Sequence, residues 1–551
     1  MSCGYDLKQP MGKKRIFDIM PLRNLKYYPL LPYFFIVILA GYLLLINLDN
    51  VYFWEDEAET AMLSKSILKF GCPMVFDGSN FILQSPNSYV DDYKYIYHPW
   101  LQFYIVSLSF KLFGETTWAG RIPFAFIGVL CFLFSFSLTQ KVFRNLIISS
   151  LAAVILLLNV PLLDHFRQCR YYALSTFMVL LACYTYLKWE TNKLMYLCFI
   201  LSLIGLFHSN YATFVPTFLA FIAHYYWANR NKTNIIKNKY TLAFSLIILT
   251  SIPWIFFLKI FKKESQLSIN YFFGHFVYYL FLLNIAIPLV LFLFIPLAIK
   301  KYQYIKMQDD SLVKNFILLS LLMIMLNFIF ISLNRQIFYR YLIHLIPIFS
   351  ILLSYLIYLG FQNQKIIGAA FLSLLLFTNV LNYIPIKIID YTAAKIKLEK
   401  ITKKLEGFSI KSLFFIYISE INQTDVMCPT KAIIFYLNNN GKKGDMVYTN
   451  YDDLPLMFYT KLRIQSRYLL NPEWTDKYPD PDWIIIRKDW EYYQRELKDI
   501  IQKHPFKEIV LETLDKKFGN NPDPLYKYFL IENNPRPIII YNKIDEQNLR
   551  K

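Results

Sequence analysis

Long apolar runs separated by short polar segments fill most of the chain up to about residue 390. A membrane-spanning helix needs roughly 20 consecutive apolar residues, and runs close to that length recur along this part. The pattern therefore predicts a polytopic α-helical membrane protein with about eleven spans. The predicted spans cover residues 31–48, 120–140, 147–163, 173–187, 195–208, 211–228, 241–258, 280–299, 315–333, 341–360 and 366–386.

One more apolar segment, residues 98–114, has two interpretations. It is short, carries Lys111 and begins with His98-Pro99, so it either crosses the membrane or lies in the interface. Lysine and arginine accumulate in the short cytoplasmic loops of membrane proteins. A non-spanning segment and a cytoplasmic N-terminus place the larger number of these residues inside. We therefore expect an interfacial helix here, and a C-terminus outside the inner or plasma membrane.

This topology divides the chain into three parts. Residues 1–30 form a cytoplasmic N-terminal segment, and residues 31–389 form a transmembrane module with a long external first loop at 49–119. The composition then shifts to Asp, Asn, Pro and Lys, which predicts an external soluble α/β domain over residues 390–551. Its expected strands lie in 444–450, 482–488 and 537–544, and its expected helices in 452–462, capped by Asp452 or Asp453, and 489–503.

Composition supports a membrane protein and excludes several other classes. With 56% hydrophobic residues and a mean hydropathy of +0.33, the chain is too apolar for an ordinary soluble enzyme. The net charge of +19 fits basic loops at lipid headgroups, so we expect no nucleic-acid partner. The seven cysteines form no CxxC pair and predict neither a disulfide framework nor a zinc site.

The stretch FWEDEAETAM, residues 53–62, concentrates acidic residues in the first external loop. Asp56 is a suitable helix N-cap, with Glu59 completing a capping box and Gly71 ending the helix. A carboxylate at a helix start near the lipid is also well placed as a general base, and the two roles can coexist. Asp56 is the first candidate and Glu57 the second, whereas we expect Glu55 and Glu59 to be solvated or capping.

Cationic and aromatic side chains gather at the predicted outer ends of the spans. Each arginine there either extends to lipid headgroups or binds a phosphate, for which its planar guanidinium is suited. His208 likewise has two interpretations, a packing residue or a ligand contact. The residues concerned are His98, Arg121, Arg167, Arg170, Arg335 and Arg340, with Tyr171 and Tyr172 after Arg170 and Tyr341 after Arg340.

Several signatures of other functions are missing from the sequence. There is no P-loop, no GxGxxG after a strand, no HExxH and no GxSxG. Few ionisable residues fall in the middle of the predicted spans, which argues against an ion-coupled transporter. A transporter or flippase of lipid-linked glycans, and a non-catalytic membrane assembly protein, remain the alternatives to an enzyme.

Five motifs in order resemble the polyprenyl-phosphate-dependent membrane glycosyltransferases of the GT-C superfamily. The nearest groups are the dolichyl-phosphate-mannose–protein mannosyltransferases and the lipid A aminoarabinose transferases, and the resemblance covers about residues 35–360. The motifs are FWEDEAETAMLSKSILKFG (53–71), YHPWLQFYIVSLSFKLFG (97–114), TTWAGRIPFAFIG (116–128), FRQCRYYALSTF (166–177) and FYRYLIHLIPIF (338–349).

The resemblance implies a GT-C fold and an inverting transfer of a hexose or pentose. The donor would be a polyprenyl-phosphate sugar, and the acceptor a hydroxyl of a glycan, lipid or protein at the outer face. The implied roles are Asp56 as general base with Glu57 beside it, donor-phosphate binding by His98, Arg121, Arg170 and Arg340, and sugar or acceptor contacts by Tyr172, His208 and Arg167.

The chain departs from the family pattern in two places. Where some members have Arg-Pro-Asp, this chain has Arg170-Tyr171-Tyr172 and so lacks a second acidic residue there. Trp100 replaces the second proline after His98. The resemblance leaves open the sugar, the acceptor and the need for a divalent metal.

Overall fold

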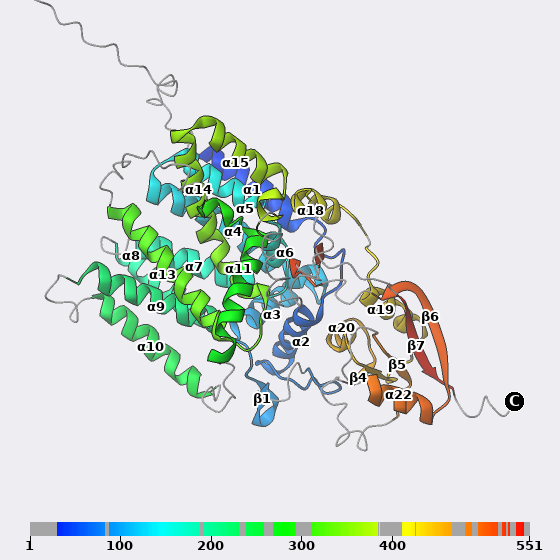
Figure 1. The fold of residues 1–551 in the computed structure, drawn as a ribbon. Helices are drawn as coiled ribbons and strands as arrows, with labels where there is room; N and C mark the ends of the chain where they lie inside the picture. The colour runs from blue at the N-terminus through cyan, green and yellow to red at the C-terminus, as the bar shows by residue number, and fades with distance from the viewer. Residues whose placement is uncertain are drawn as a thin grey trace, which may run out of the picture.

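The computed structural model describes most of the chain. The described residues are 30–82, 88–187, 192–230, 239–257, 268–293, 311–383, 385, 410–424, 426–465, 480–487, 494–515, 521–524, 527–528 and 536–544. The predicted N-terminal segment therefore lies almost wholly outside the described residues, as does the first part of the predicted helix 489–503. The described part is mainly helical, with a small sheet near the C-terminal end (Figure 1).

Most helices of the helical part are apolar, and they follow the order that the sequence pattern predicts. The helices are α1 (Leu30–Leu45), α2 (Glu55–Phe70), α3 (Leu101–Phe113), α4 (Thr117–Phe143), α5 (Leu146–Leu157), α6 (Val160–Phe166), α7 (Tyr172–Tyr186), α8 (Lys193–Phe207), α9 (Tyr211–Ala228), α10 (Lys239–Phe257), α11 (Phe272–Ala286), α13 (Ser311–Leu333), α14 (Ile346–Asn363) and α15 (Lys365–Phe377). Three 3-10 helices, η3 (Asp91–Tyr93), η5 (Ile269–Tyr271) and η6 (Tyr339–Leu345), and the small hairpin β1 (Tyr89–Val90) and β2 (Lys94–Tyr95) complete this part.

A polytopic helical architecture is confirmed at a coarse level. Among the described residues, five helices are long and apolar enough to cross a membrane, or six if the bent pair α5–α6 is one span. Several further apolar helices are shorter, α3 among them. The count of about eleven spans and the interfacial placement of α3 therefore stay predictions.

Two predicted spans are interrupted in the structure. The predicted span 147–163 is broken by a 68° bend between α5 and α6, where the Asn159 side chain caps the new helix by accepting from Leu162 N at 3.1 Å. The predicted span 280–299 starts inside helix α11, which runs from Phe272 to Ala286, and is interrupted after it. Ile287 is extended before Pro288, as the residue before a proline favours. Residues 294–299 lie outside the described residues, so the end of this span stays a prediction.

The C-terminal elements form an α/β unit, as the sequence predicts. Its five-stranded sheet has the order β4-β3-β5-β7-β6. Strands β4, β3 and β5 are parallel to one another, and β7 is antiparallel to both of its neighbours, β5 and β6. The elements are α18 (Leu413–Ile421), α19 (Pro429–Asn440), β3 (Met446–Thr449), α20 (Asp453–Tyr459), β4 (Arg463–Gln465), β5 (Trp483–Ile485), α22 (Gln494–Lys503), β6 (Phe506–Asp515) and β7 (Arg536–Lys543). The three predicted strands are therefore confirmed as β3, β5 and β7, while β4 and β6 were not predicted.

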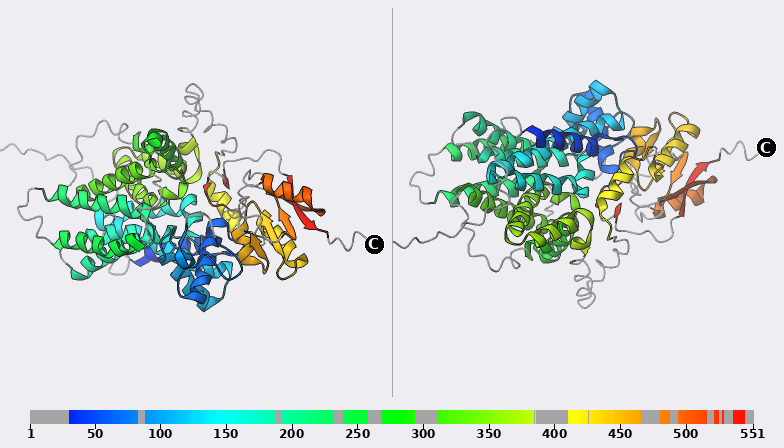
Figure 2. Two further views of the ribbon diagram at one scale, coloured as in Figure 1. Left: turned by 90° about the horizontal axis from the view of Figure 1, so that it is seen from below. Right: turned by 90° about the horizontal axis from the view of Figure 1, so that it is seen from above.

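The α/β unit packs against the loop that joins α1 to α4. Helix α20 lies beside α2, and both views of Figure 2 place the first loop next to the C-terminal elements. At the end of α1, Tyr417 donates to Leu43 O at 2.7 Å and Asn47 donates to Ile421 O at 3.0 Å. Arg167 donates to three carbonyls of the same helix end, those of Leu43, Ile46 and Asn47. This loop is thus held on several sides.

The close contact between Gly120 of α4 and Phe53 predicts a strong effect of a single methyl group. A Cβ at Gly120 would lie 2.6 Å from Phe53 Cζ, whereas a Cβ at Gly274 would meet nothing within 4 Å. We expect Gly120→Ala to lower the free energy of unfolding by roughly 1–3 kcal/mol through overpacking. Gly274→Ala should leave it unchanged or slightly higher, since alanine favours helices. Thermal unfolding of both variants in detergent checks this, and equal melting temperatures would contradict it.

Candidate functional site

Helix α2 begins two residues earlier than the sequence predicts. Its N-cap is Trp54, and Glu57 at the third helical position accepts a hydrogen bond from Trp54 N at 3.4 Å. The predicted capping box of Asp56 and Glu59 is therefore wrong. The predicted C-terminus is confirmed, because Gly71 adopts a left-handed conformation (φ 79°) and donates to Ile67 O. Because Trp54 is the N-cap, the Asp56 side chain has no capping role and is available for other contacts.

Glu57 is held in a closed ion pair with Arg121 of α4. The guanidinium donates Nε to Glu57 Oε1 at 2.8 Å and Nη2 to Oε2 at 2.6 Å, and Cys169 N donates to Oε1 at 2.8 Å. The remaining N–H groups of Arg121 donate to the carbonyls of Leu48, Val51 and Tyr52. All five donors of this guanidinium are thus engaged within the protein. This geometry favours a positioning role for the pair.

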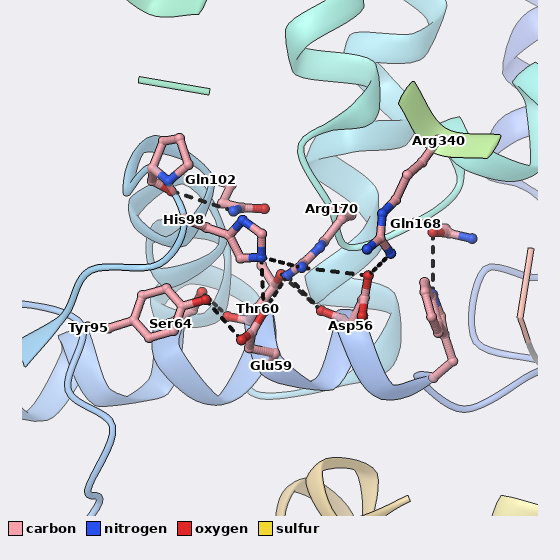
Figure 3. A network of polar contacts seen from close by, with 12 residues as sticks. Asp56, Glu59, Thr60, Ser64, Tyr95, His98, Gln102, Gln168, Arg170 and Arg340 are labelled. Carbon is pink, nitrogen blue, oxygen red and sulfur yellow. Dashed lines mark hydrogen bonds and ion pairs between the residues drawn. The ribbon is translucent and has the colours of Figure 1, made fainter. Parts of the chain in front are cut away.

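Asp56 faces two arginines from distant parts of the chain (Figure 3). Arg340 of η6 donates Nη1 directly to Asp56 Oδ2, and Arg170 Nη2 lies 3.7 Å from the same oxygen. The Asp56 and Arg340 side chains are 9% and 19% exposed, so the pair is buried on one side and accessible on the other. Two guanidinium groups this close favour the ionised carboxylate.

Glu59 lies fully inside the protein, so the expectation that it is solvated or capping is wrong. Arg170 Nη1 donates to Glu59 Oε2 at 2.9 Å, and the Tyr95 hydroxyl donates to Oε1 at 2.9 Å. Burial raises the pKa of Glu59 above its ordinary value, although Arg170 opposes this shift. Glu55 is also buried. The spacing of Asp56, Glu59 and Thr60 along one helix face was the sequence signal for this buried polar face.

Arg170 connects the acidic helix with His98. Its Nη1 also donates to Asp56 O and Thr60 Oγ1, and its Nη2 lies 3.1 Å from His98 Nε2. A guanidinium has no acceptor, so His98 Nε2 must accept, which places the proton of a neutral imidazole on Nδ1. Burial disfavours the charged guanidinium, but the carboxylates of Asp56 and Glu59 raise the pKa of Arg170.

Three buried donors around Asp56 have no hydrogen-bond partner within the part of the chain that the structure describes. They are Arg170 Nε, Arg340 Nε and the Tyr172 hydroxyl. Buried polar groups are normally paired, so a group of unpaired donors in one place calls for an explanation. An anion with several acceptor oxygens would pair with them.

The other predicted contacts have different surroundings. Arg167 donates to the carbonyls at the end of α1, as described above, and this geometry favours a structural role. Tyr172 packs on His165, with ring centroids 5.0 Å apart, at the edge of the Asp56 cluster. His208 ends α8 and packs on Trp254, with centroids 5.4 Å apart. The structure thus gathers Asp56, Glu57, His98, Arg121, Arg170, Arg340 and Tyr172 around the start of α2.

The sequence did not point to one buried acidic residue, which follows the predicted span 147–163. Asp164 of α6 is 8% exposed and receives hydrogen bonds from Lys527 Nζ at 2.9 Å and the Tyr528 hydroxyl at 2.7 Å. Lys527 also pairs with Glu420 at 2.8 Å. Across the described residues, no group of three or more His, Cys, Asp or Glu side chains is placed to hold a metal ion.

Comparisons with known proteins agree with this fold. Residues 97–257 match the family model described as dolichyl-phosphate-mannose-protein mannosyltransferase. The structure resembles ArnT from Cupriavidus metallidurans bound to undecaprenyl phosphate, with a TM-score of 0.52, 12% identity and coverage of 94% of this chain and 98% of that one. For the apo state of ArnT the TM-score is 0.53, with the same identity and coverage.

A further structural match is the oligosaccharyltransferase AglB from Archaeoglobus fulgidus in complex with an inhibitory peptide and a dolichol-phosphate. Its TM-score is 0.46 at 10% identity, covering 84% of this chain and 69% of that one. No curated protein sequence matches the chain. The family match and the ArnT fold confirm the resemblance to the polyprenyl-phosphate-dependent membrane glycosyltransferases of the GT-C superfamily.

The buried ion pair of Glu57 and Arg121 predicts a large loss of stability when the negative charge of Glu57 is removed. Glu57→Gln leaves the Arg121 guanidinium buried without its counter-charge, so we expect a loss of roughly 3–5 kcal/mol. Glu115→Gln removes a surface pair with Lys65, whose partners are 45% and 30% exposed, and should cost about 0–1 kcal/mol. Thermal unfolding of both variants provides the comparison. A Glu57→Gln protein as stable as the wild type would contradict the anchoring role.

Proposed function

We propose that the protein transfers a sugar from a polyprenyl-phosphate donor to an acceptor hydroxyl at the outer face of the membrane. The observation that carries this proposal is the set of unpaired buried donors of Arg170, Arg340 and Tyr172 beside Asp56, whose side chain is 9% exposed. The donors suit the phosphate, and the carboxylate suits the proton of the acceptor. The undecaprenyl phosphate bound to the similar ArnT structure supports a lipid phosphate as the ligand.

The reaction requires one bond to form as another breaks. Asp56 accepts the proton of the acceptor hydroxyl, whose oxygen attacks the anomeric carbon of the sugar. The bond from this carbon to the phosphate oxygen breaks, and the lipid phosphate leaves as an anion. Arg340 and Arg170 stabilise the charge that develops on it. Attack from the side opposite the phosphate inverts the anomeric centre.

Arg340 has two successive partners in this scheme. Without donor it pairs with Asp56, and a bound phosphate competes with the carboxylate for the guanidinium. Donor binding then releases Asp56 toward the acceptor. His98, within hydrogen-bond distance of Arg170, is placed to orient the phosphate-binding group, while Glu57 and Arg121 keep the start of α2 in place.

The proposed site requires the topology expected from the sequence. Residues 1–30 are cytoplasmic, residues 31–389 form the transmembrane module, and the loop 49–119 and the α/β domain 390–551 are external. The sugar is then exposed outside while its lipid tail stays among the helices, so no nucleotide site is needed. The acceptor is a glycan, lipid or protein hydroxyl, and the transferred sugar is a hexose or pentose.

Replacing the base should separate binding from turnover. Asp56→Asn cannot accept a proton, so we expect kcat to fall by about 10²–10⁴-fold. Donor binding should stay equal or tighten, because Arg340 is no longer shared with a carboxylate. Release of free polyprenyl phosphate from a panel of polyprenyl-phosphate sugars measures turnover, and Asp92→Asn, an exposed carboxylate of the same loop, is the control. Full turnover in Asp56→Asn would refute the base, and no release by the wild type would favour a transporter or flippase.

The phosphate-binding role of Arg340 has a matched control five residues away. Arg340→Gln removes a donor to the developing charge, so we expect kcat/KM for the donor to fall by about 10²–10³-fold. Arg335→Gln changes an exposed arginine at the same end of α13 and should stay within about twofold of wild type. Initial rates at varied donor concentration measure both variants. Equal losses in the two would indicate a general effect of charge rather than a contact to phosphate.

A further inference from the structure

The last two residues of helix α20 cover the residues that precede α2. The ring of Tyr459 stacks on Tyr52, with centroids 4.1 Å apart and an interplanar angle of 14°. Phe458 meets Phe53 edge-on at 5.1 Å. Tyr52 and Phe53 lie directly before the N-cap of α2, so this end of the α/β unit contacts the start of the helix that carries Asp56.

The Tyr459 hydroxyl joins two helix starts. It accepts a hydrogen bond from Phe53 N at 2.9 Å and lies 2.7 Å from Thr117 Oγ1. Because the phenol oxygen accepts from Phe53, its own proton is available to Thr117. Thr117 is the first residue of α4, one turn before Arg121, which binds Glu57. The first turn of α4 is therefore connected with the start of α2 by two contacts. One runs from Thr117 through the Tyr459 hydroxyl to Phe53, and the other is the ion pair of Arg121 with Glu57.

Helix α20 is itself fixed by buried charges within the α/β unit. Its N-cap, Asp452, has a left-handed backbone (φ 64°) and pairs with Arg487, which also binds Asp515 at 2.6 Å. The Thr430 hydroxyl donates to Asp452 Oδ2 at 2.8 Å. The side chains of Arg487, Asp452 and Asp515 are 2%, 1% and 5% exposed. This network holds one end of α20, and Tyr459 forms the other end.

We propose that Tyr459 is a positioning residue for sugar transfer. Its hydroxyl fixes Phe53 and thereby the place of Asp56 relative to Arg340, so the α/β unit is part of the catalytic apparatus. This inference rests on the proposed function. Small displacements of a catalytic group lower the rate strongly while leaving distant substrate contacts intact. A defect at Tyr459 should therefore appear in kcat and leave the KM for the donor unchanged.

Tyr459→Phe tests the inference because it keeps the ring stack and removes only the hydroxyl. We expect kcat to fall about tenfold, with the donor KM within about twofold of wild type. Hydrogen exchange read by mass spectrometry gives a second readout that needs no activity. The Phe53 amide loses its acceptor, so the peptide covering residues 50–56 should exchange at least about tenfold faster. Tyr436→Phe, whose ring faces Trp483 within the same unit, is the control and should match wild type in both measurements.

The outcomes distinguish this inference from the proposed function. An inactive wild type would refute sugar transfer, and with it the catalytic part of the inference, whatever the exchange data show. An active wild type with an unchanged kcat in Tyr459→Phe overturns the positioning role, as does a fall seen only in the affinity for the donor. If Tyr459→Phe does not fold, Thr117→Val removes the other partner of the hydroxyl. The Phe53 amide keeps its acceptor in that variant, so the readout is kcat, and a wild-type kcat would overturn the inference as well.

Discussion

Pairing of buried carboxylates with arginines is the constraint on which the rest of the site depends. Helix α2 carries four carboxylates within its first five residues, and a carboxylate taken out of water is tolerated only when a cation and further hydrogen bonds compensate it. Three of the four pair with arginines from different parts of the chain, so α4, the loop before α7 and η6 all converge on one helix start. The pairs are Glu57 with Arg121, Glu59 with Arg170, and Asp56 with Arg340.

The three pairs differ in how much of the arginine is left for a ligand. Arg121 has all five donors engaged, so its pair is closed to substrate. Arg170 is almost fully buried but keeps an unpaired Nε, and Arg340 is more exposed and keeps another. The three arginines thus differ in exposure and in the number of donors left unpaired. Only Arg340, the most exposed of them, can exchange its carboxylate partner for a phosphate. These differences explain why four acidic residues in one stretch need not have the same function.

The sequence predicted the features that local patterns determine, such as helices and a helix end. It did not predict the burial of charged residues that depends on partners far away in the chain. The apolar runs gave most helices, and Gly71 gave the end of α2, because hydrophobic burial and left-handed backbone leave local signals. Asp56 is a good cap by composition, yet Trp54 became the N-cap because Glu57 and Arg121 hold the preceding turn. Glu59 is buried through Arg170, 111 residues away, and Asp164 through Lys527, 363 residues away. No periodicity records such pairings, so the partners of these two residues could not be identified from the sequence.

Helix α2, which carries the acidic residues, also explains the position of the α/β unit, because α2 needs contacts on the side that this unit covers. Helix α2 belongs to a loop, so neighbouring spans alone cannot fix both of its sides. The C-terminal part contacts the helical part at two places, through Tyr459 before the start of α2 and through Lys527 at Asp164 of α6. Lys527 neutralises the buried carboxylate of Asp164, and this ion pair holds the C-terminal segment against α6. A unit that holds the residues before α2 restrains the geometry of the site even when it contributes no reacting atom.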